Sequence, residues 1–195
     1  VKLDGNYPTG TSNVALGNTA LDSVEAGGTN NVAIGDEAGT AITTGDNNTA
    51  VGKDALKATT TSANNTAIGS CALDANTTGS SNTAVGRNSL GSNIDGVYNS
   101  AVGHNSLATN STGDNNTGIG YNALVSNTTA TGNTAVGKDS LKENVDGGNN
   151  TAVGLCSLRN NSTGGNNTAI GFRAGEDATG GQNTALGSCA LFDNS

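Results

Sequence analysis

Residues 150–167 read Asn-Thr-Ala-Val-Gly-Leu-Cys-Ser-Leu-Arg-Asn-Asn-Ser-Thr-Gly-Gly-Asn-Asn, and variants of this phrase fill most of the chain. The glycine in its fifth place, called the motif glycine below, recurs about every 17 residues, as from Gly137 to Gly154. It stands at positions 17, 35, 52, 69, 86, 103, 120, 137, 154, 171 and 187. A period this short and regular is typical of a solenoid, whose stability comes from stacking turn on turn. We therefore predict an all-β chain forming a parallel β-solenoid, or β-roll, of eleven coils with a 17-residue repeat.

The repeat also defines the domain organisation. Residues 13–195 are expected to form one β-solenoid repeat domain, because the repeat continues without a change in composition. Residues 1–12 precede it and are expected to form a separate strand and turn. Hydrophobic residues make up 33% of the chain and aromatic residues 3%, which is typical of either disorder or a thin repetitive core. Because the aliphatic residues keep one phase through every repeat, the pattern favours the thin core.

The first segment of each repeat is predicted to be a short strand. Thr117 and Ile119 are two residues apart and therefore share one face of such a strand. Other repeats carry Thr, Val or Ser in the first of these places and Val, Ile or Leu in the second. We expect this mostly β-branched face to point into the core. The position between them is Ala in every repeat except at Gly118. We therefore expect the opposite face of the strand to be packed too, against another chain. The alternative is that the Ala residues were simply inherited when the repeats were duplicated.

A second apolar row follows the motif glycine. Three and four residues after it, Ala or Ser is followed by Leu, with Gly39 and Gly175 as exceptions. The remaining residues are mainly Asn, Ser, Thr and Gly, which favour turns. Each coil is therefore predicted to bend twice around two short strands, and eleven coils at about 4.8 Å per strand give a rod of roughly 50 Å. The Asn that opens each repeat is expected either to form an internal amide ladder or to cap a turn.

Composition argues against several classes of function. The net charge of -8 and the sequence pI of about 4.3 disfavour nucleic acid as a partner, because phosphate binding needs clustered Lys and Arg. No stretch approaches the roughly 20 apolar residues that cross a bilayer, so no membrane insertion is expected. His104 is the only histidine and is interpreted as a surface residue rather than a catalytic base. We expect no catalytic residues, no metal site and no cofactor, and hence no enzyme.

The three cysteines share one place in the repeat. Cys71, Cys156 and Cys189 each stand two residues after a motif glycine. The nearest pair, Cys156 and Cys189, is two coils apart, or roughly 9–10 Å at sheet spacing, which exceeds the usual Cα separation of a disulfide. Polar residues occupy the same place in other repeats, so this row is expected to be exposed. The cysteines are therefore interpreted as free thiols or as links between chains.

The N-terminal segment is a candidate for joining subunits. Residues Val1, Lys2, Leu3 and Asp4 alternate like a strand, and Gly5, Asn6 and Tyr7 lead into a turn before the only proline, Pro8. The repeat reaches the C-terminus without an atypical capping repeat. We hypothesise that this segment pairs with the end of the next copy by strand addition and builds a head-to-tail filament. The alternative is that both ends are cuts from a longer fibre.

Two phrases carry a resemblance to known repeats. Residues 30–38, Asn-Asn-Val-Ala-Ile-Gly-Asp-Glu-Ala, are similar to the head repeats of trimeric autotransporter adhesins of the YadA type. The fuller unit over residues 116–132 resembles the repeats of phage and bacterial tail-fibre proteins. The resemblance implies a parallel β-roll, usually a homotrimer, that serves as a stalk or adhesive head on a cell or virion surface. Residues 1–195 have longer turns than the adhesin head repeats, and no coiled-coil stalk, membrane anchor or self-cleaving chaperone domain is expected within them.

These patterns favour a structural function. The chain is predicted to be an extracellular fibre or filament subunit, on a cell or virion surface, whose partners are copies of itself in a head-to-tail filament or homotrimer. The alternative is a surface-binding module, such as an adhesin head or a tail-fibre receptor binder that contacts a host-cell or environmental surface. Scattered aromatic residues offer few anchors for that role: Tyr98, Tyr121, Phe172 and Phe192. Ice binding is a further alternative, disfavoured here because the Thr row is expected to be buried.

Overall fold

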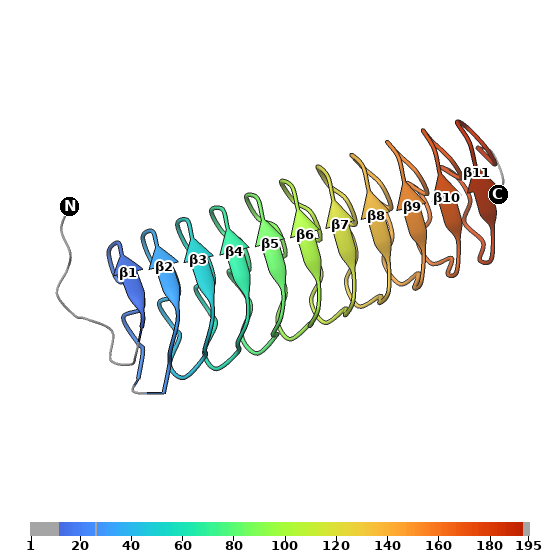
Figure 1. Ribbon diagram of the computed structural model, residues 1–195. Coiled ribbons are helices and arrows are strands. Elements are labelled where there is room, and N and C mark those ends of the chain that lie inside the picture. Colours follow the sequence, from blue (N-terminus) through green and yellow to red (C-terminus); the bar gives the residue numbers. More distant parts are fainter. Residues whose placement is uncertain (1–11, 26, 193–195) are drawn as a thin grey trace.

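The computed structural model describes residues 12–25 and 27–192 as a single stack of coils. Its strands are three residues long and succeed one another along a rod, with β1 and β11 at opposite ends (Figure 1). They are β1 (Val14–Leu16), β2 (Val32–Ile34), β3 (Thr49–Val51), β4 (Thr66–Ile68), β5 (Thr83–Val85), β6 (Ser100–Val102), β7 (Thr117–Ile119), β8 (Thr134–Val136), β9 (Thr151–Val153), β10 (Thr168–Ile170) and β11 (Thr184–Leu186). The segment predicted to join subunits, residues 1–7, lies outside the described residues.

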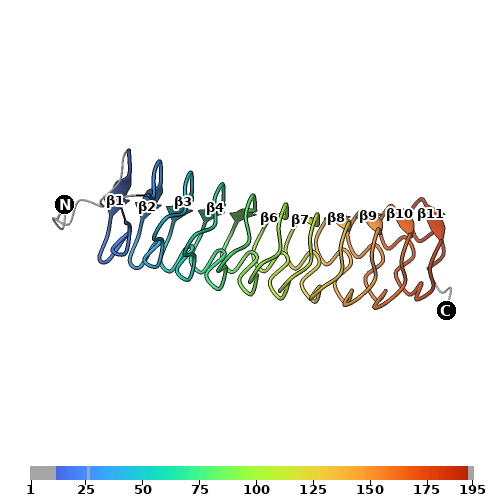
Figure 2. The same cartoon turned by 90° about the horizontal axis from the view of Figure 1, so that it is seen from below.

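All of these strands belong to one parallel sheet. Each strand pairs with the next in sequence order, from β1 to β11. The pairing keeps the repeat in register, so that Thr117 lies beside Thr134 and Ile119 beside Val136. Figure 2 shows the strands along one side of the rod, with the turns on the other. The parallel β-solenoid with its 17-residue repeat is therefore confirmed.

The strand faces point the opposite way from the prediction. Ala135 and its equivalents from Ala33 to Ala169 are completely or almost completely buried, whereas the Thr and aliphatic residues on either side face outward and are exposed or partly exposed. The opposite wall of the coil explains this arrangement: the row of Leu residues from Leu56 to Leu158 is buried in the same core cluster as the Ala row. Because a Leu reaches across each coil, the strand has room for only a methyl group. The Ala row thus packs inside its own chain.

The Ala-Leu segment is a turn, not the second strand that we predicted. Leu124 has a φ of 53°, and its equivalents in other coils have similarly positive values. This left-handed backbone is uncommon for a bulky residue, and it bends the chain so that the Leu side chain points inward. Gly39 and Gly175, the two exceptions in the sequence, have φ values of 58° and 57°. They keep the same backbone bend, and Ile42 lies against the space that a side chain at Gly39 would fill.

The motif glycines mark the closest approach between coils. Gly120 has a φ of 136°, and a Cβ placed there would lie 2.6 Å from the carbonyl oxygen of Gly137. The same clash recurs from Gly17 to Gly171. No L-residue with a side chain fits both the backbone angle and the contact, so the 17-residue spacing of glycine reflects the stacking distance of the coils.

The Asn that opens each repeat, called the motif asparagine, both links coils and supports a turn. Its Oδ1 accepts the backbone N–H of the next motif asparagine at 2.8–3.0 Å, in a series from Asn13 to Asn183. Its Nδ2 donates to a turn carbonyl of the following coil, as Asn116 does to Ala130 at 2.8 Å. The expectation that this residue caps a turn therefore holds. The expected amide ladder is replaced by a ladder through backbone N–H groups, with one direct amide contact, from Asn48 Nδ2 to Asn31 Oδ1 at 3.1 Å.

A second row of buried asparagines forms the true amide ladder. The Nδ2 atoms of Asn93, 110, 127, 144 and 161 each donate to the Oδ1 of the preceding member, starting at Asn76, over 2.7–3.4 Å. At one end Asn76 donates to Thr59 Oγ1. At the other end the next coil carries Ala178, and Asn161 Oδ1 is buried without a partner. This row was not predicted from the sequence, although Asn recurs seven residues after the motif glycine in these coils.

Candidate functional site

The outward side of the sheet is a regular surface that runs from β1 to β11. We call it the sheet face and define it by the outer residues of each strand, typified by Thr117 and Ile119. The aliphatic residues of this face are substantially exposed, for example Val102 at 40%, Ile119 at 41% and Ile170 at 42% of their full surface. Because β-branched side chains stand in rows on adjacent strands, their methyl groups form a continuous apolar stripe.

No charged residue interrupts the sheet face. Its Thr row includes only Val14, Val32 and Ser100 as substitutions, and its aliphatic row contains only Val, Ile and Leu. Ten parallel pairings at about 4.8 Å and strands about 10 Å long give the face an area of about 500 Å². About half of this area belongs to the Thr row, so the apolar stripe itself covers about 250 Å², an amount that a soluble monomer ordinarily exposes. Such a surface is suited to contact with another surface of equal regularity.

Two rows of residues border the sheet face. The exit edge consists of the residue after each motif glycine: Asn18, Asp36, Lys53, Ser70, Arg87, His104, Tyr121, Lys138, Leu155, Phe172 and Ser188. The entry edge consists of the residue two places before each motif asparagine from Asn31 onward: Thr29, Asp46, Ala63, Ser80, Val97, Asp114, Thr131, Gly148, Gly165 and Gly181. The sheet face keeps the same residue types along the rod, whereas the residue types of both edges change from coil to coil.

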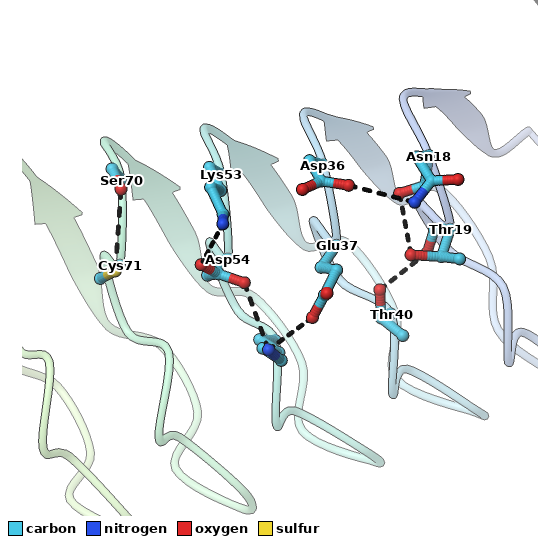
Figure 3. Close-up of polar contacts among 10 residues, drawn as sticks. Asn18, Thr19, Asp36, Glu37, Thr40, Lys53, Asp54, Ser70 and Cys71 are labelled. Carbon is cyan, nitrogen blue, oxygen red and sulfur yellow. Dashed lines mark hydrogen bonds and ion pairs between the residues drawn. The ribbon is translucent and has the colours of Figure 1, made fainter.

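The first coils carry polar and charged residues on the exit edge. Figure 3 shows Asn18 donating to Asp36, at 3.2 Å, and Lys53 beside Asp54, with Nζ and Oδ2 3.8 Å apart. Lys53 remains largely exposed, with 61% of its side-chain surface accessible. Exposed ion pairs of this kind contribute little to stability, so the Lys53 ammonium group is free to meet another carboxylate.

The middle coils carry a stack of basic and aromatic side chains on the same edge. Arg87 Nη1 lies 3.0 Å from His104 Nε2. The rings of His104 and Tyr121 are stacked, with centroids 5.5 Å apart, and Lys138 Nζ lies 5.9 Å from the centre of the Tyr121 ring. His104 is therefore a surface residue, as predicted, but it belongs to a ladder. Because His104 stacks on the Tyr121 ring and Lys138 Nζ also lies over that ring, Tyr121 offers no open platform for a stacking ligand.

Asp139 ends a surface amide ladder next to this stack. Asn88 donates to Asn105, Asn105 to Asn122, and Asn122 to Asp139, at 2.9, 3.5 and 3.2 Å. Burial raises the pKa of Asp139, but hydrogen bonds from Lys138 and Asn122 and the charges of Lys138 and Lys142 outweigh burial and lower the pKa of this carboxyl below its usual value. Lys138 Nζ lies 2.6 Å from Asp139 Oδ2. The Asp139 carboxylate therefore has a structural role, as the partner of Asn122 and Lys138.

The cysteines lie beside the exit edge and are unpaired. Cys71 and Cys156 are partly buried and Cys189 is exposed, and all three are free thiols. The predicted row is therefore present, but only one member is fully on the surface. Links between chains through these thiols stay a prediction.

Within residues 12–25 and 27–192, no group of three His, Cys, Asp or Glu side chains is arranged to hold a metal ion. No helix in this part of the chain is long and apolar enough to span a bilayer. The sheet face and its two edges are consequently the features on which a functional interpretation rests.

Comparison with protein-family models, with curated proteins and with solved structures finds no match for this chain.

Proposed function

We propose that this chain is a structural segment of an extracellular fibre or filament, at a cell or virion surface, that assembles with copies of itself. The observation that carries the proposal is the sheet face: uncharged rows of aliphatic and Thr side chains that run from β1 to β11. Two such faces are mutually complementary because their coil spacings are identical. Side-by-side contact through the sheet face would cover the apolar stripe and stiffen the fibre.

The dimensions support association of copies. With both edges included, the sheet face spans about seven residues in width and offers about 1,000 Å², compared with about 800 Å² per partner in a typical stable protein interface. The internal ladders support the structural role, because they join every coil to the next by buried hydrogen bonds. End-to-end joining through residues 1–7 remains part of the proposal as a second mode of contact.

Sedimentation velocity of the purified chain over a range of concentrations tests self-association. We expect an oligomer that dissociates when Val102 and Ile119 are both replaced by Asp, because two buried carboxylates oppose an apolar contact. The matched control replaces Thr112 and Thr129 by Asp; these turn residues are exposed, and other coils already carry Asp95 and Asp146 in the same place. A wild-type chain that sediments as a monomer throughout would contradict the proposal.

A second candidate function, surface binding, gains one observation. The Thr row lies on the outer side of the sheet, contrary to the expectation that it is buried, and its hydroxyl groups repeat at strand spacing. This removes the sequence-based objection to an ice-binding solenoid. A thermal-hysteresis measurement distinguishes the two functions: activity in the wild-type chain that the Val102 and Ile119 variant loses would favour ice binding, and its absence leaves self-association as the use of this face.

A further inference from the structure

We propose that one turn of the rod, residues 94–98, is a docking site for a basic segment of a protein other than this chain. This inference goes beyond the proposed self-association and does not depend on it. The turn reads Ile-Asp-Gly-Val-Tyr, whereas the corresponding turns of other coils consist mainly of Thr, Ser, Asn and Gly. Ile94 is exposed at 48% and Tyr98 at 64%. No other such turn combines three bulky apolar residues, so the needs of the repeat do not explain this one.

Tyr98 occupies a strained backbone position. Its φ is 58°, in the left-handed region that bulky residues rarely adopt. The same place, directly before the motif asparagine, carries smaller residues with positive φ in other coils: Asn30, Asn47, Asn64, Ser81, Asn115, Gly132, Asn149, Asn166 and Gln182. Leu124 offsets a similar cost by burying its side chain, but Tyr98 does not, because most of its surface is accessible. Strain that burial does not offset is a reason to look for a function.

The Tyr98 ring and hydroxyl are both available to a partner. The Tyr121 ring stacks on His104, and the Phe192 ring lies under Arg173. Within residues 12–25 and 27–192, the Tyr98 side chain has no hydrogen bond, stacked ring or cation of this kind. Tyr supplies apolar area together with a hydrogen-bonding group, and it is enriched among the residues that contribute most to protein interfaces.

The charge around this turn favours a basic partner. Asp95 lies within the turn and is exposed. Asp114, in the next coil, accepts the Val97 N–H through Oδ1 at 2.8 Å, which leaves its Oδ2 for a partner. Asp recurs among the five residues before the motif asparagines, whereas every described Lys and Arg stands within five residues after a motif glycine. Carboxylates beside exposed apolar side chains are complementary to a Lys or Arg that is flanked by apolar residues.

A second copy of the chain is a less suitable occupant of this turn. Contact between copies through the sheet face would use every coil, because the face repeats from β1 to β11. Residues 94–98 occur in one coil only. A site present once in the repeat domain suits a partner that binds at one height of the rod.

Selection of random peptides displayed on phage, with the purified chain as the target, tests the proposal. We expect the selected peptides to be enriched in Lys or Arg beside aromatic or aliphatic residues. A synthetic peptide of the selected sequence should bind Tyr98→Asn at least about tenfold more weakly than the wild-type chain. Tyr121→Asn is the matched control, because it removes an exposed Tyr of the exit edge, and it should leave binding unchanged. Asp95→Thr, which restores the residue type of Thr78 and Thr112, should weaken binding and reduce its dependence on salt.

Denaturant unfolding separates a binding role of Tyr98 from a structural one. We expect Tyr98→Asn to raise the unfolding midpoint, because Asn tolerates the left-handed region better; a lower midpoint would assign Tyr98 to structure instead. Failure to select any peptide, selection of acidic peptides, or equal binding to wild type and Tyr98→Asn would overturn the proposal. Sedimentation velocity tests the other occupant: self-association should be the same in Tyr98→Asn, and its loss would place residues 94–98 in a contact between copies.

Discussion

At the scale of single residues, the chain places asparagine where one side chain must serve two coils. The amide group carries a donor and an acceptor, so each buried asparagine except Asn161 both gives and receives a hydrogen bond. A hydroxyl is shorter, and a carboxylate has no donor. This explains why Asn116, Asn127 and their equivalents are completely buried although they are polar, since a buried polar group costs little when its partners are present.

The unpaired end of the second ladder yields the first prediction. Asn161 Oδ1 is buried without a partner, and the next coil has Ala178 in the ladder position. We expect Ala178→Asn to stabilise the chain by about 1 kcal/mol, because its Nδ2 group supplies the missing donor. Ala178→Asp is the matched control, since it has nearly the same shape but no donor and adds a buried charge. Denaturant unfolding measures both; equal stabilities for the two variants would refute the hydrogen-bond explanation.

Asp139 gives the chain an acid-sensitive contact. Its pKa is lower in the folded chain than its ordinary value, which is about 3.9 in an unfolded chain. The resulting stabilisation is fully present above the unfolded value and is lost as the pH falls through the folded value. We therefore expect wild-type stability to fall below about pH 4 more steeply than that of Asp139→Asn. Thermal unfolding across this range measures the difference, and parallel pH profiles would count against the assignment.

At the scale of the element, each coil is shaped by a few positions with unusual backbone angles. The motif glycine, the residue two places after it, the Leu and the residue before the motif asparagine all have positive φ. Asn and Asp recur at two of these places because they tolerate the left-handed region better than most residues. Leu does not, and it persists because its buried side chain offsets the cost of about 1–2 kcal/mol.

Two glycine substitutions distinguish a positive φ combined with close contact between coils, as at Gly120, from a positive φ that Asn also adopts, as at Gly132. Gly120→Ala is expected to destabilise the chain by several kcal/mol, at least the roughly 1–3 kcal/mol of backbone strain, because the new Cβ would also meet the Gly137 carbonyl oxygen at 2.6 Å. Gly132→Asn is the control. Gly132 has a φ of 73° at a place where Asn115 and Asn149 adopt 57° and 58°. Its new Cβ would lie 2.6 Å from Asn149 Oδ1, the end of a side chain that rotates away at much lower cost than a backbone carbonyl, so we expect a much smaller change. Unfolding midpoints of the two variants test this contrast.

At the scale of the whole molecule, the rod behaves as a one-dimensional array. Each strand contacts only the strand before it and the strand after it, so stability is a sum of coils and of contacts between neighbours. The lengths of the sheet face and of the asparagine ladders both increase with the number of coils. Length is therefore the property that this architecture changes most easily.

Removal of one whole repeat tests this independence. Deletion of residues 117–133 joins Asn116 directly to Thr134 and restores the motif. We expect a folded rod shortened by about 5 Å, measured as the maximum dimension in small-angle X-ray scattering. Deletion of residues 117–125 removes only part of a coil and shifts the register of everything that follows, so we expect loss of structure by circular dichroism. If both deletions unfold the chain, the coils are not independent units.

Sequence and tertiary structure determined different properties of this protein. The period and the parallel stacking followed from the sequence, because the constraint that one coil imposes on the next is repeated in every copy. The turn at the Ala-Leu segment did not, since its apolar residues suit a second strand equally well. The direction of the strand faces did not follow, since Ala and Val or Ile both suit a buried strand. The Leu of the opposite wall decided it: once Leu124 fills the coil, only the Ala row fits inside, and Thr117 and Ile119 face outward. That choice created the sheet face, and with it the surface on which the proposed function depends.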